Sequence, residues 1–164
     1  MVELHGLTKV FKNIRAVDNL SFRVEEEIYG LLGENGAGKT TTLRMLVAMV
    51  KPPSGTAKIN GKDLIKEPEA IRSIVHEPKV MLFDEPTSGL DVGSVREVHD
   101  FIRFCKEEGK TIIFSSHSMA EVEKLCDKIG IIHKGKLIEE GSIEVLKEKY
   151  KTDNLEELFM EFGR

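Results

Sequence analysis

The 164-residue chain contains no tryptophan, no glutamine and only two cysteines, Cys105 and Cys126. Each cysteine lies in a stretch with helical patterning, so a disulfide framework is not indicated. No apolar run approaches the ~20 residues of a membrane-spanning helix. The first residues also lack the basic start and apolar stretch of a secretion signal. We therefore expect a cytoplasmic protein that does not cross a bilayer by itself.

The chain also has no excess of positively charged residues. The formal net charge is −4 and no long basic run occurs, so nucleic acid is not an expected partner. Hydrophobic residues make up 40% and charged residues 32% of the chain, which is typical of a globular protein. The length suits one domain with a hydrophobic core. No internal repeat or low-complexity tract is evident.

The most informative stretch is Gly33-Glu34-Asn35-Gly36-Ala37-Gly38-Lys39-Thr40, followed by Thr41. It comes directly after the apolar run Ile28–Leu32, which is typical of a buried strand, and it opens a helix-compatible segment. Glycines at such a turn let backbone N–H groups approach phosphate oxygens, and the positive end of the helix favours the same anion. Lys39 then reaches the β- and γ-phosphates, and the Thr40 hydroxyl binds Mg²⁺. The alternative is a glycine-rich turn that matches by chance.

Two further strand ends carry polar groups. Val80–Phe83 is an apolar run typical of a central parallel strand, and it ends in Asp84 and Glu85. A second buried strand is predicted at Thr111–Ser115. Ser118 and Glu121 have the spacing of a capping box, which places His117 at a strand-to-helix junction. The alternative for Asp84 and Glu85 is an acidic start of a helix, and the alternative for His117 is an ordinary capped surface histidine.

The other segments predict a small antiparallel flap and several helices. The flap combines Val2–Phe11, Leu20–Val24 and Thr56–Ile59, with a turn at Asn60-Gly61. Helices are predicted over residues 67–74 and 92–108, and a hairpin around Lys134-Gly135. In the tail, Ser142 and Asp153 are candidate caps of two short helices. The apolar stripe expected in the tail consists of Leu155, Leu158, Phe159 and Phe162.

Taken in order, these motifs resemble those of an ABC-type ATPase subunit. The matching residues are Gly33–Thr41 as Walker A, Val80–Glu85 as Walker B with its adjoining glutamate, Ser88–Asp91 as the D-loop and His117 as the switch histidine. The resemblance implies an α/β P-loop NTPase fold with a mostly parallel sheet flanked by helices and an N-terminal antiparallel β flap. It places an ABC-type ATP-binding domain over residues 1–141 and a C-terminal helical tail over residues 142–164.

The same resemblance implies a role for each matching residue. Glu85 acts as general base on the attacking water, His117 holds the γ-phosphate, and Asp91 lies at a dimer seam. Thr40 and Asp84 hold Mg²⁺. Phe11 stacks on adenine, although core packing is an equally good explanation of that ring. The residues expected to bind the nucleotide are Phe11, Gly33, Asn35, Gly36, Ala37, Gly38, Lys39, Thr40 and Thr41.

The family relationship also implies partners. Besides ATP and Mg²⁺, these are an integral-membrane permease subunit and a second ATP-binding subunit, identical or different. The chain would then lie peripherally on the cytoplasmic face of the cell membrane. The sequence does not indicate the transported substrate, the direction of transport or the identity of the permease.

The middle of the chain departs from the family pattern. No glutamine is present for a Gln-loop, no Ser-Gly-Gly triplet forms a signature, and the helical subdomain is missing between Ile74 and Val75. Three explanations remain open: residues left out at this point, a chain shortened by design, or a natural degenerate relative. Since the family sandwiches ATP between the cradle of one subunit and the signature of the other, we expect binding to survive and turnover to be very low. Two other functions stay open: a non-catalytic nucleotide-binding regulatory module, or an ABC ATPase outside transport.

Overall fold

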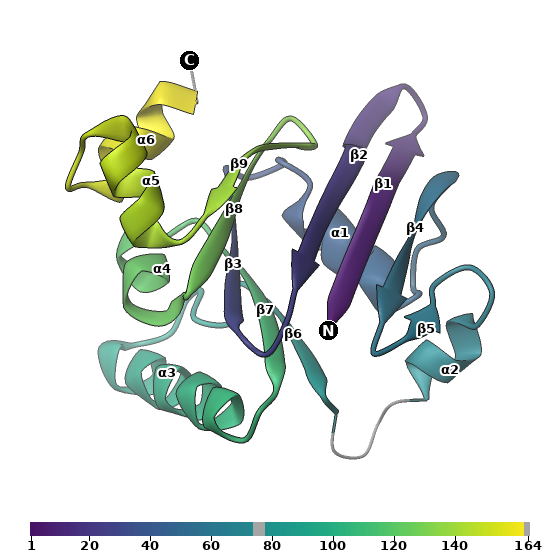
Figure 1. Cartoon of the computed structure of the whole chain (residues 1–164), viewed down its shortest axis with the longest axis horizontal. Helices are drawn as coiled ribbons and strands as arrows, with labels where there is room; N and C mark the ends of the chain where they lie inside the picture. Colours follow the sequence, from purple (N-terminus) through teal and green to yellow (C-terminus); the bar gives the residue numbers. More distant parts are fainter. Residues whose placement is uncertain (74–77, 163–164) are drawn as a thin grey trace.

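The computed structural model describes residues 1–73 and 78–162 (Figure 1). The predicted junction between Ile74 and Val75 lies outside these residues. The strands are β1 (Val2–Phe11), β2 (Ile14–Val24), β3 (Ile28–Leu32), β4 (Ser54–Ile59), β5 (Lys62–Asp63), β6 (Val80–Asp84), β7 (Thr111–Ser116), β8 (Lys128–His133) and β9 (Lys136–Gly141). The helices are α1 (Lys39–Leu46), α2 (Pro68–Arg72), α3 (Val92–Glu107), α4 (Met119–Leu125), α5 (Ile143–Tyr150) and α6 (Leu155–Phe162).

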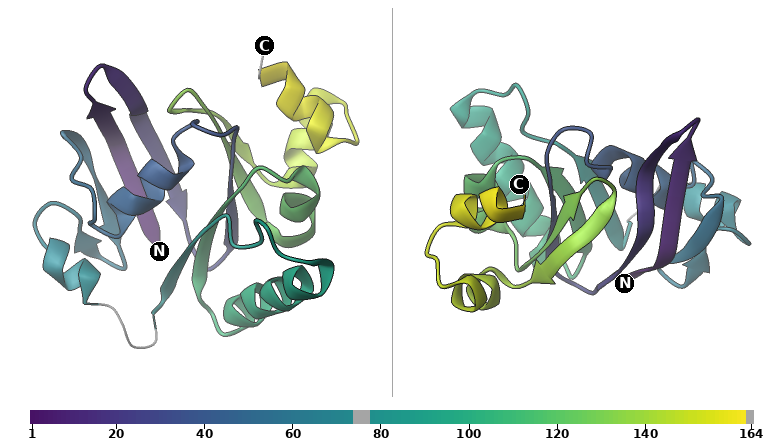
Figure 2. Two further views of the ribbon diagram at one scale, coloured as in Figure 1. Left: turned by 180° about the vertical axis from the view of Figure 1, so that it is seen from behind. Right: turned by 90° about the horizontal axis from the view of Figure 1, so that it is seen from above.

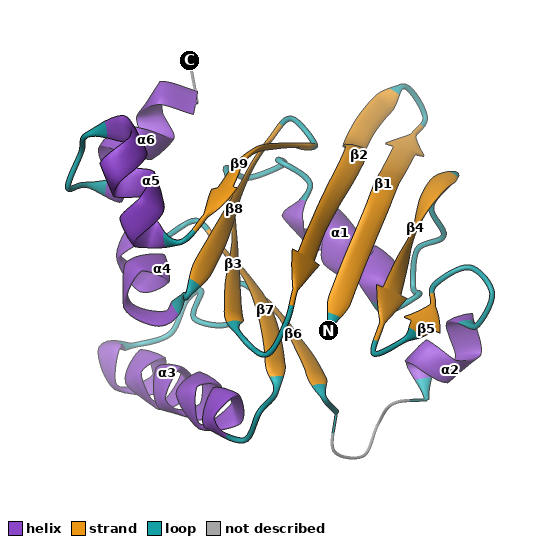
Figure 3. Ribbon diagram, viewed as in Figure 1, coloured by secondary structure: helices purple, strands orange, loops and turns teal. Residues whose placement is uncertain are grey.

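The N-terminal flap is a four-stranded antiparallel sheet with the strand order β2-β1-β4-β5 (Figure 3). Its last hairpin turns at Asn60 and Gly61, which both have positive φ angles of 49° and 79°. Asparagine and glycine adopt such angles at little cost, which is why this pair predicts a turn. The flap predicted from the sequence is confirmed, with β2 longer than the alternation of Leu20–Val24 indicated.

The second sheet has five strands in the order β6-β7-β3-β8-β9. β6, β7, β3 and β8 run parallel, and β9 returns antiparallel from β8. The connecting turn has φ angles of 47° at Lys134 and 81° at Gly135, the signs required by a type I′ turn. The hairpin predicted here is therefore confirmed, as is the mostly parallel sheet.

Strand β3 shows how the molecule is layered. Its neighbouring side chains point to opposite faces. Tyr29 and Leu31 join α1 and the flap in one buried cluster, whereas Ile28 and Leu32 join α3 to α6 in a second. Helix α1 thus lies between the two sheets, and the other large helices cover the far face of the parallel sheet (Figure 2).

Strand β6 corrects one expectation. Its apolar run predicts a central strand, but among the described residues β6 pairs only with β7 and forms the edge of the sheet. Its four apolar side chains are half-buried. The pattern reports side chains that pack on both faces: Val80 and Leu82 lie against one core cluster, Met81 and Phe83 against the other. It carries no information on whether a strand has one neighbour or two.

The helices largely follow the sequence pattern. Ile102 and Cys105 of α3 are buried, and Leu155 and Leu158 fix the tail to the same core. The cap of α6 is Asn154 and not Asp153, because the Asn154 Oδ1 accepts from the Glu156 N–H at 2.8 Å. Ser142 caps α5 as predicted. The side chain of Phe162 and the predicted helical residue Ile74 lie outside what the structure describes.

Residues 73–79 connect α2 with β6, and residues 74–77 among them lie outside the described part of the chain. None of the helices in the described residues has the length and hydropathy needed to span a membrane. Both cysteines are free thiols, and burial raises the pKa of Cys126 well above its usual value.

Candidate functional site

The site lies where three parallel strands end side by side. Leu32 at the end of β3 pairs with Ser116 of β7, and Asp84 at the end of β6 pairs with Ser115. The residues that follow each strand therefore emerge along one edge of the sheet. This register brings together the glycine-rich loop, Glu85 and His117, three features that are far apart in the sequence.

The loop is held in place by close backbone contacts that only glycine permits. A Cβ atom on Gly38, which has a φ of 111°, would lie 2.3 Å from the carbonyl oxygen of Ala16 in the flap. A Cβ atom on Gly33 would lie 2.5 Å from the carbonyl oxygen of Ile132 in β8. Both distances exclude any side chain, so the two glycines fit the loop against both sheets.

The β8–β9 turn fastens the same loop. The Gly135 N–H donates to the Ala37 carbonyl oxygen at 2.9 Å, and the Gly135 carbonyl oxygen accepts from the Asp18 N–H at 2.8 Å. The turn thus connects the loop with strand β2. A loop fixed on several sides in this way is already shaped before a ligand arrives, which lowers the ordering cost of binding.

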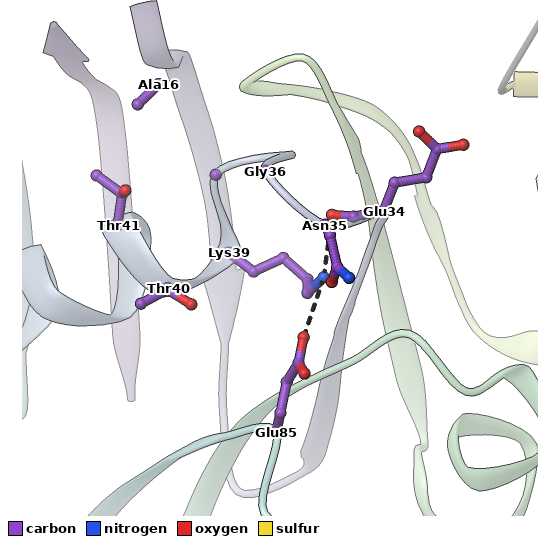
Figure 4. A pocket seen from close by; sticks show the side chains of 9 residues that line it. Ala16, Glu34, Asn35, Gly36, Lys39, Thr40, Thr41 and Glu85 are labelled. Carbon is purple, nitrogen blue, oxygen red and sulfur yellow. Dashed lines mark hydrogen bonds and ion pairs between the residues drawn. The ribbon is translucent and has the colours of Figure 1, made fainter. Parts of the chain in front are cut away.

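A cavity of about 130 Å³ opens above the loop (Figure 4). It is lined by Ala16, Glu34, Asn35, Gly36, Gly38, Lys39, Thr40, Thr41 and Glu85. At Gly36 a Cβ atom would meet no atom within 4 Å, so this part of the loop faces open space. The start of α1 at Lys39 adds N–H groups without partners in the helix. These features fit a bound phosphate chain.

Lys39 is buried in this cavity, with 4% of its side chain exposed. Its Nζ donates to the carbonyl oxygens of Gly33 at 2.5 Å and Glu34 at 3.2 Å, and it lies 3.5 Å from Glu85 Oε1. The ammonium group is therefore directed across the mouth of the loop, toward the acidic pair.

Glu85 occupies the centre of the site. It adopts a φ of 46°, an uncommon conformation for a residue with a side chain. The Glu85 N–H donates to Ser115 Oγ at 3.0 Å, which holds this conformation. Its carboxylate lies between two partners, Lys39 and His117, whose Nδ1 is 3.3 Å from Glu85 Oε2.

The second carboxylate, Asp84, is linked to the loop by hydroxyl groups. Thr40 Oγ1 donates to Asp84 Oδ1 at 3.1 Å, and Ser115 Oγ donates to the same atom at 2.7 Å. Among the described residues no group of three His, Cys, Asp or Glu could hold a metal ion. The pair of oxygen ligands instead fits Mg²⁺, which keeps water and phosphate oxygens for most of its coordination.

Neither Asp91 nor Phe11 lines the cavity. Asp91 is the N-cap of α3 and accepts from the N–H groups of Gly93 and Ser94 at 2.9 and 3.2 Å. The Ser94 hydroxyl, 2.6 Å from Asp91 Oδ2, lowers the pKa of this carboxyl. Phe11 is 47% exposed at the end of β1, and Lys9 Nζ lies 5.1 Å from the centre of its ring.

Sequence reasoning missed three residues of the site. Ala16 lines the cavity from the flap, and Ser115 bonds both Asp84 and the backbone of Glu85. Glu34 also lines the cavity. For Ser115 a signal exists, since two serines end an otherwise apolar strand. Nothing in the local sequence marks Ala16, because its contact with the loop is a backbone contact across the fold.

Two family models and several known proteins match the sequence of this chain. The family model described as ABC transporter covers residues 17–73, and a model described as AAA domain, putative AbiEii toxin, Type IV TA system covers residues 70–123. The ABC transporter ATP-binding protein NatA of Bacillus subtilis is 30% identical, with 91% of each chain covered. The uncharacterized ABC transporter ATP-binding protein MJ1023 of Methanocaldococcus jannaschii is 34% identical, covering 87% of this chain and 78% of the relative.

Solved structures show the same fold. An ATP binding subunit of an ABC transporter superposes with a TM-score of 0.90 at 20% identity over the whole of both chains. The ATP-binding cassette MJ0796 bound to ADP and Pi, a dimer, gives 0.75 at 17% identity over 87% of this chain and 99% of that one. The alignment with NatA spans 223 residues, more than the 164 of this chain, so the relative contains residues without a counterpart here. The chain belongs to the ATP-binding proteins of ABC transporters, a family of ATPases.

Proposed function

We propose that this chain binds Mg-ATP in the cavity above the glycine-rich loop and hydrolyses it slowly, as the peripheral, cytoplasmic-face subunit of a transporter with a separate permease. The position of Glu85 between Lys39 and His117 carries the proposal. One carboxylate there faces both the ammonium group that would hold phosphate and the imidazole that would orient it. Within the family, that is the arrangement that hydrolysis of a bound triphosphate requires.

The residues divide the work as follows. N–H groups of residues 36–41 and the Lys39 ammonium hold the β- and γ-phosphates. Thr40 and Asp84 hold Mg²⁺, which neutralises phosphate charge when bound. Glu85 takes a proton from water on one carboxylate oxygen, and water adds to the γ-phosphorus while the bond to the β-phosphate oxygen breaks. His117, whose Nδ1 lies 3.3 Å from Glu85 Oε2, would offer Nε2 to a γ-phosphate oxygen.

A second copy or a related subunit is proposed to face the D-loop. Two exposed apolar side chains flank Asp91: Leu90 is 44% exposed and Val92 is 89% exposed. Apolar residues presented together at a site are more typical of a contact surface than of an isolated solvent face. The adenine contact of Phe11 is part of the same proposal, and its exposed ring supports it.

Slow turnover is proposed because the chain has no signature sequence. Groups supplied across a subunit seam to a transferring phosphoryl group contribute roughly 10³ to 10⁵ in rate. Without them, the chain keeps the groups that bind the nucleotide but lacks half of the catalytic environment. The same absence favours a second candidate, a nucleotide-binding module that acts on a partner without catalysis.

Two measurements on one sample separate these functions. Mg-ATP affinity is measured by calorimetry, and steady-state phosphate release is compared with that of a Glu85→Gln variant. Release that disappears in Glu85→Gln supports the ATPase. Binding with release no higher than in that variant supports the module, and no binding at all overturns both.

A further inference from the structure

The first turn of α4 departs from the capping box that its sequence predicts. The Ser118 hydroxyl accepts from the Glu121 N–H at 3.4 Å, as expected. The reciprocal bond from Glu121 to the Ser118 N–H is replaced, because that N–H donates to Ser116 Oγ at 3.0 Å. The Glu121 carboxylate is thereby available for other partners.

Those partners connect three elements. Ser116 Oγ, at the end of β7, donates to Glu121 Oε2 at 2.6 Å, and His99 Nε2, from the middle of α3, lies 3.1 Å from Glu121 Oε1. All three residues are buried: Ser116 is 3%, Glu121 7% and His99 9% exposed. Among the described residues no fully buried side-chain nitrogen or oxygen lacks a hydrogen-bond partner.

A buried polar cluster of this kind contributes little net free energy to the stability of a fold. Burying a carboxylate costs several kcal/mol even when it is bonded, and apolar residues of similar size often serve stability equally well or better. A hydrogen-bonded buried network instead holds its members in one geometry. Ser116 and Ser118 are the residues on either side of His117. The geometry that the network fixes here is therefore that of the backbone at His117.

The side chain of His117 is largely open to solvent. Its side chain is 56% exposed and its Nδ1 reaches Glu85 Oε2 at 3.3 Å. The orientation of the ring therefore depends on the backbone between Ser116 and Ser118. A cavity of about 300 Å³ in front of it is lined by Glu85, Glu121 and the D-loop residues Ser88 and Gly89 among others.

We propose that Ser116, Glu121 and His99 form a positioning network that keeps His117 beside Glu85 and ties this pair to helix α3. Because α3 begins at its cap Asp91, the network also fixes the D-loop relative to the switch histidine. The three residues do not touch the reacting atoms. The proposal rests on the role proposed above for His117 and Glu85, but its geometry can be tested without any hydrolysis.

The experiment uses NMR of the histidine rings in the full chain, which contains five histidines. The change in the His117 ring resonances caused by Glu85→Gln measures how closely the two side chains are coupled. We expect a clear change in the otherwise unaltered chain and its loss when Glu121→Ala is also present. Glu121→Gln should preserve it, because an amide oxygen accepts from Ser116 while the NH₂ group donates to His99.

Glu123→Ala is the matched control. Glu123 lies on the same helix. Its side chain is 33% exposed, and its carboxylate pairs with Lys147 at 2.8 Å, outside the network. It should leave the coupling intact. If Glu121→Ala does not fold, Ser116→Ala and Ser116→Thr provide the same comparison, with the hydroxyl removed in one and kept in the other.

A purely structural role gives a different result. The thermal midpoint would then fall in Glu121→Ala while Glu85→Gln still shifted the His117 resonances as before, and the proposal would be overturned. If the chain releases phosphate, kcat should fall in Glu121→Ala with KM unchanged and recover in Glu121→Gln. Absence of phosphate release in every variant would contradict the proposed function, whereas the NMR comparison would still decide on the network.

Discussion

The buried ammonium group of Lys39 gives the sharpest test of how the cavity recognises its ligand. Lys39→Met removes the charge and keeps most of the stem that packs beneath the loop. We expect weaker binding of Mg-ATP, because the Nζ that would contact the phosphates is gone. Glu85→Gln should leave the affinity nearly unchanged, since Glu85 is expected to act on water and not to hold phosphate.

The size of the effect follows from the surroundings of Lys39. With only 4% of the side chain exposed, little water replaces the lost contacts. A hydrogen bond to a charged group contributes about 1.5–3 kcal/mol. That corresponds to a rise in Kd of about 10- to 150-fold. The loss should be smaller for AMP, which lacks the two phosphates that Lys39 is expected to reach.

Calorimetry with ATP, ADP and AMP gives the affinities, and a thermal midpoint for each variant reports whether the loop is still folded. The reasoning is refuted if Lys39→Met and Glu85→Gln weaken ATP binding equally. Lys39 would then serve to hold the carbonyl groups of Gly33 and Glu34 and to neutralise Glu85. An equal loss for AMP and ATP would contradict a phosphate contact in the same way.

Three further predictions concern the loop, the cap of α3 and the tail. Gly38→Ala should lower the thermal midpoint far more than Gly36→Ala, because an added Cβ meets a backbone oxygen at 2.3 Å in the first and open space in the second. Equal shifts of the midpoint would contradict the close approach of Gly38 to the flap. The Ser94 hydroxyl lowers the pKa of Asp91, so the ionised Asp91 carboxylate stabilises the folded state above pH ~4. This stabilisation is lost as the pH falls through the folded-state pKa. When urea unfolding is measured from pH 7 to pH 2, the unfolding free energy of Asp91→Asn should therefore fall less than that of the unaltered chain. Leu158→Ala, at a side chain 1% exposed, should lower the unfolding free energy by about 2–5 kcal/mol in urea, and no change would mean that the tail is not part of the core.

Much of the site could be predicted because its signals are local. Gly33 to Thr41 combines a strand end, a glycine turn and a helix start within a few residues, and each step has a separate physical reason. The acidic pair and His117 were placed by the same logic, as polar residues after apolar strands. Parallel strands end at one edge of a sheet, so three local patterns were enough to bring these groups together.

The contacts that were missed are contacts between distant segments. His99 and Glu121 are 22 residues apart, and Glu85 meets Ser115 from a neighbouring strand. For Glu121, the local rule predicted a bond back to Ser118, yet a buried serine and a buried histidine compete for the same carboxylate. In the interior these bonds prevail, because an unpaired polar group there is costly whereas the exposed end of a helix can be bonded by water.

Strand β6 shows the other limit of a local pattern. Four consecutive apolar residues predict a strand that packs on both faces, and both core clusters indeed contact Val80–Phe83. Yet strand order depends on backbone partners, which side chains do not encode. Within the described residues β6 has one such partner, and its side chains are only half-buried. The apolar run therefore indicates that side chains pack on both faces of β6, and the number of its backbone neighbours is set by the rest of the fold.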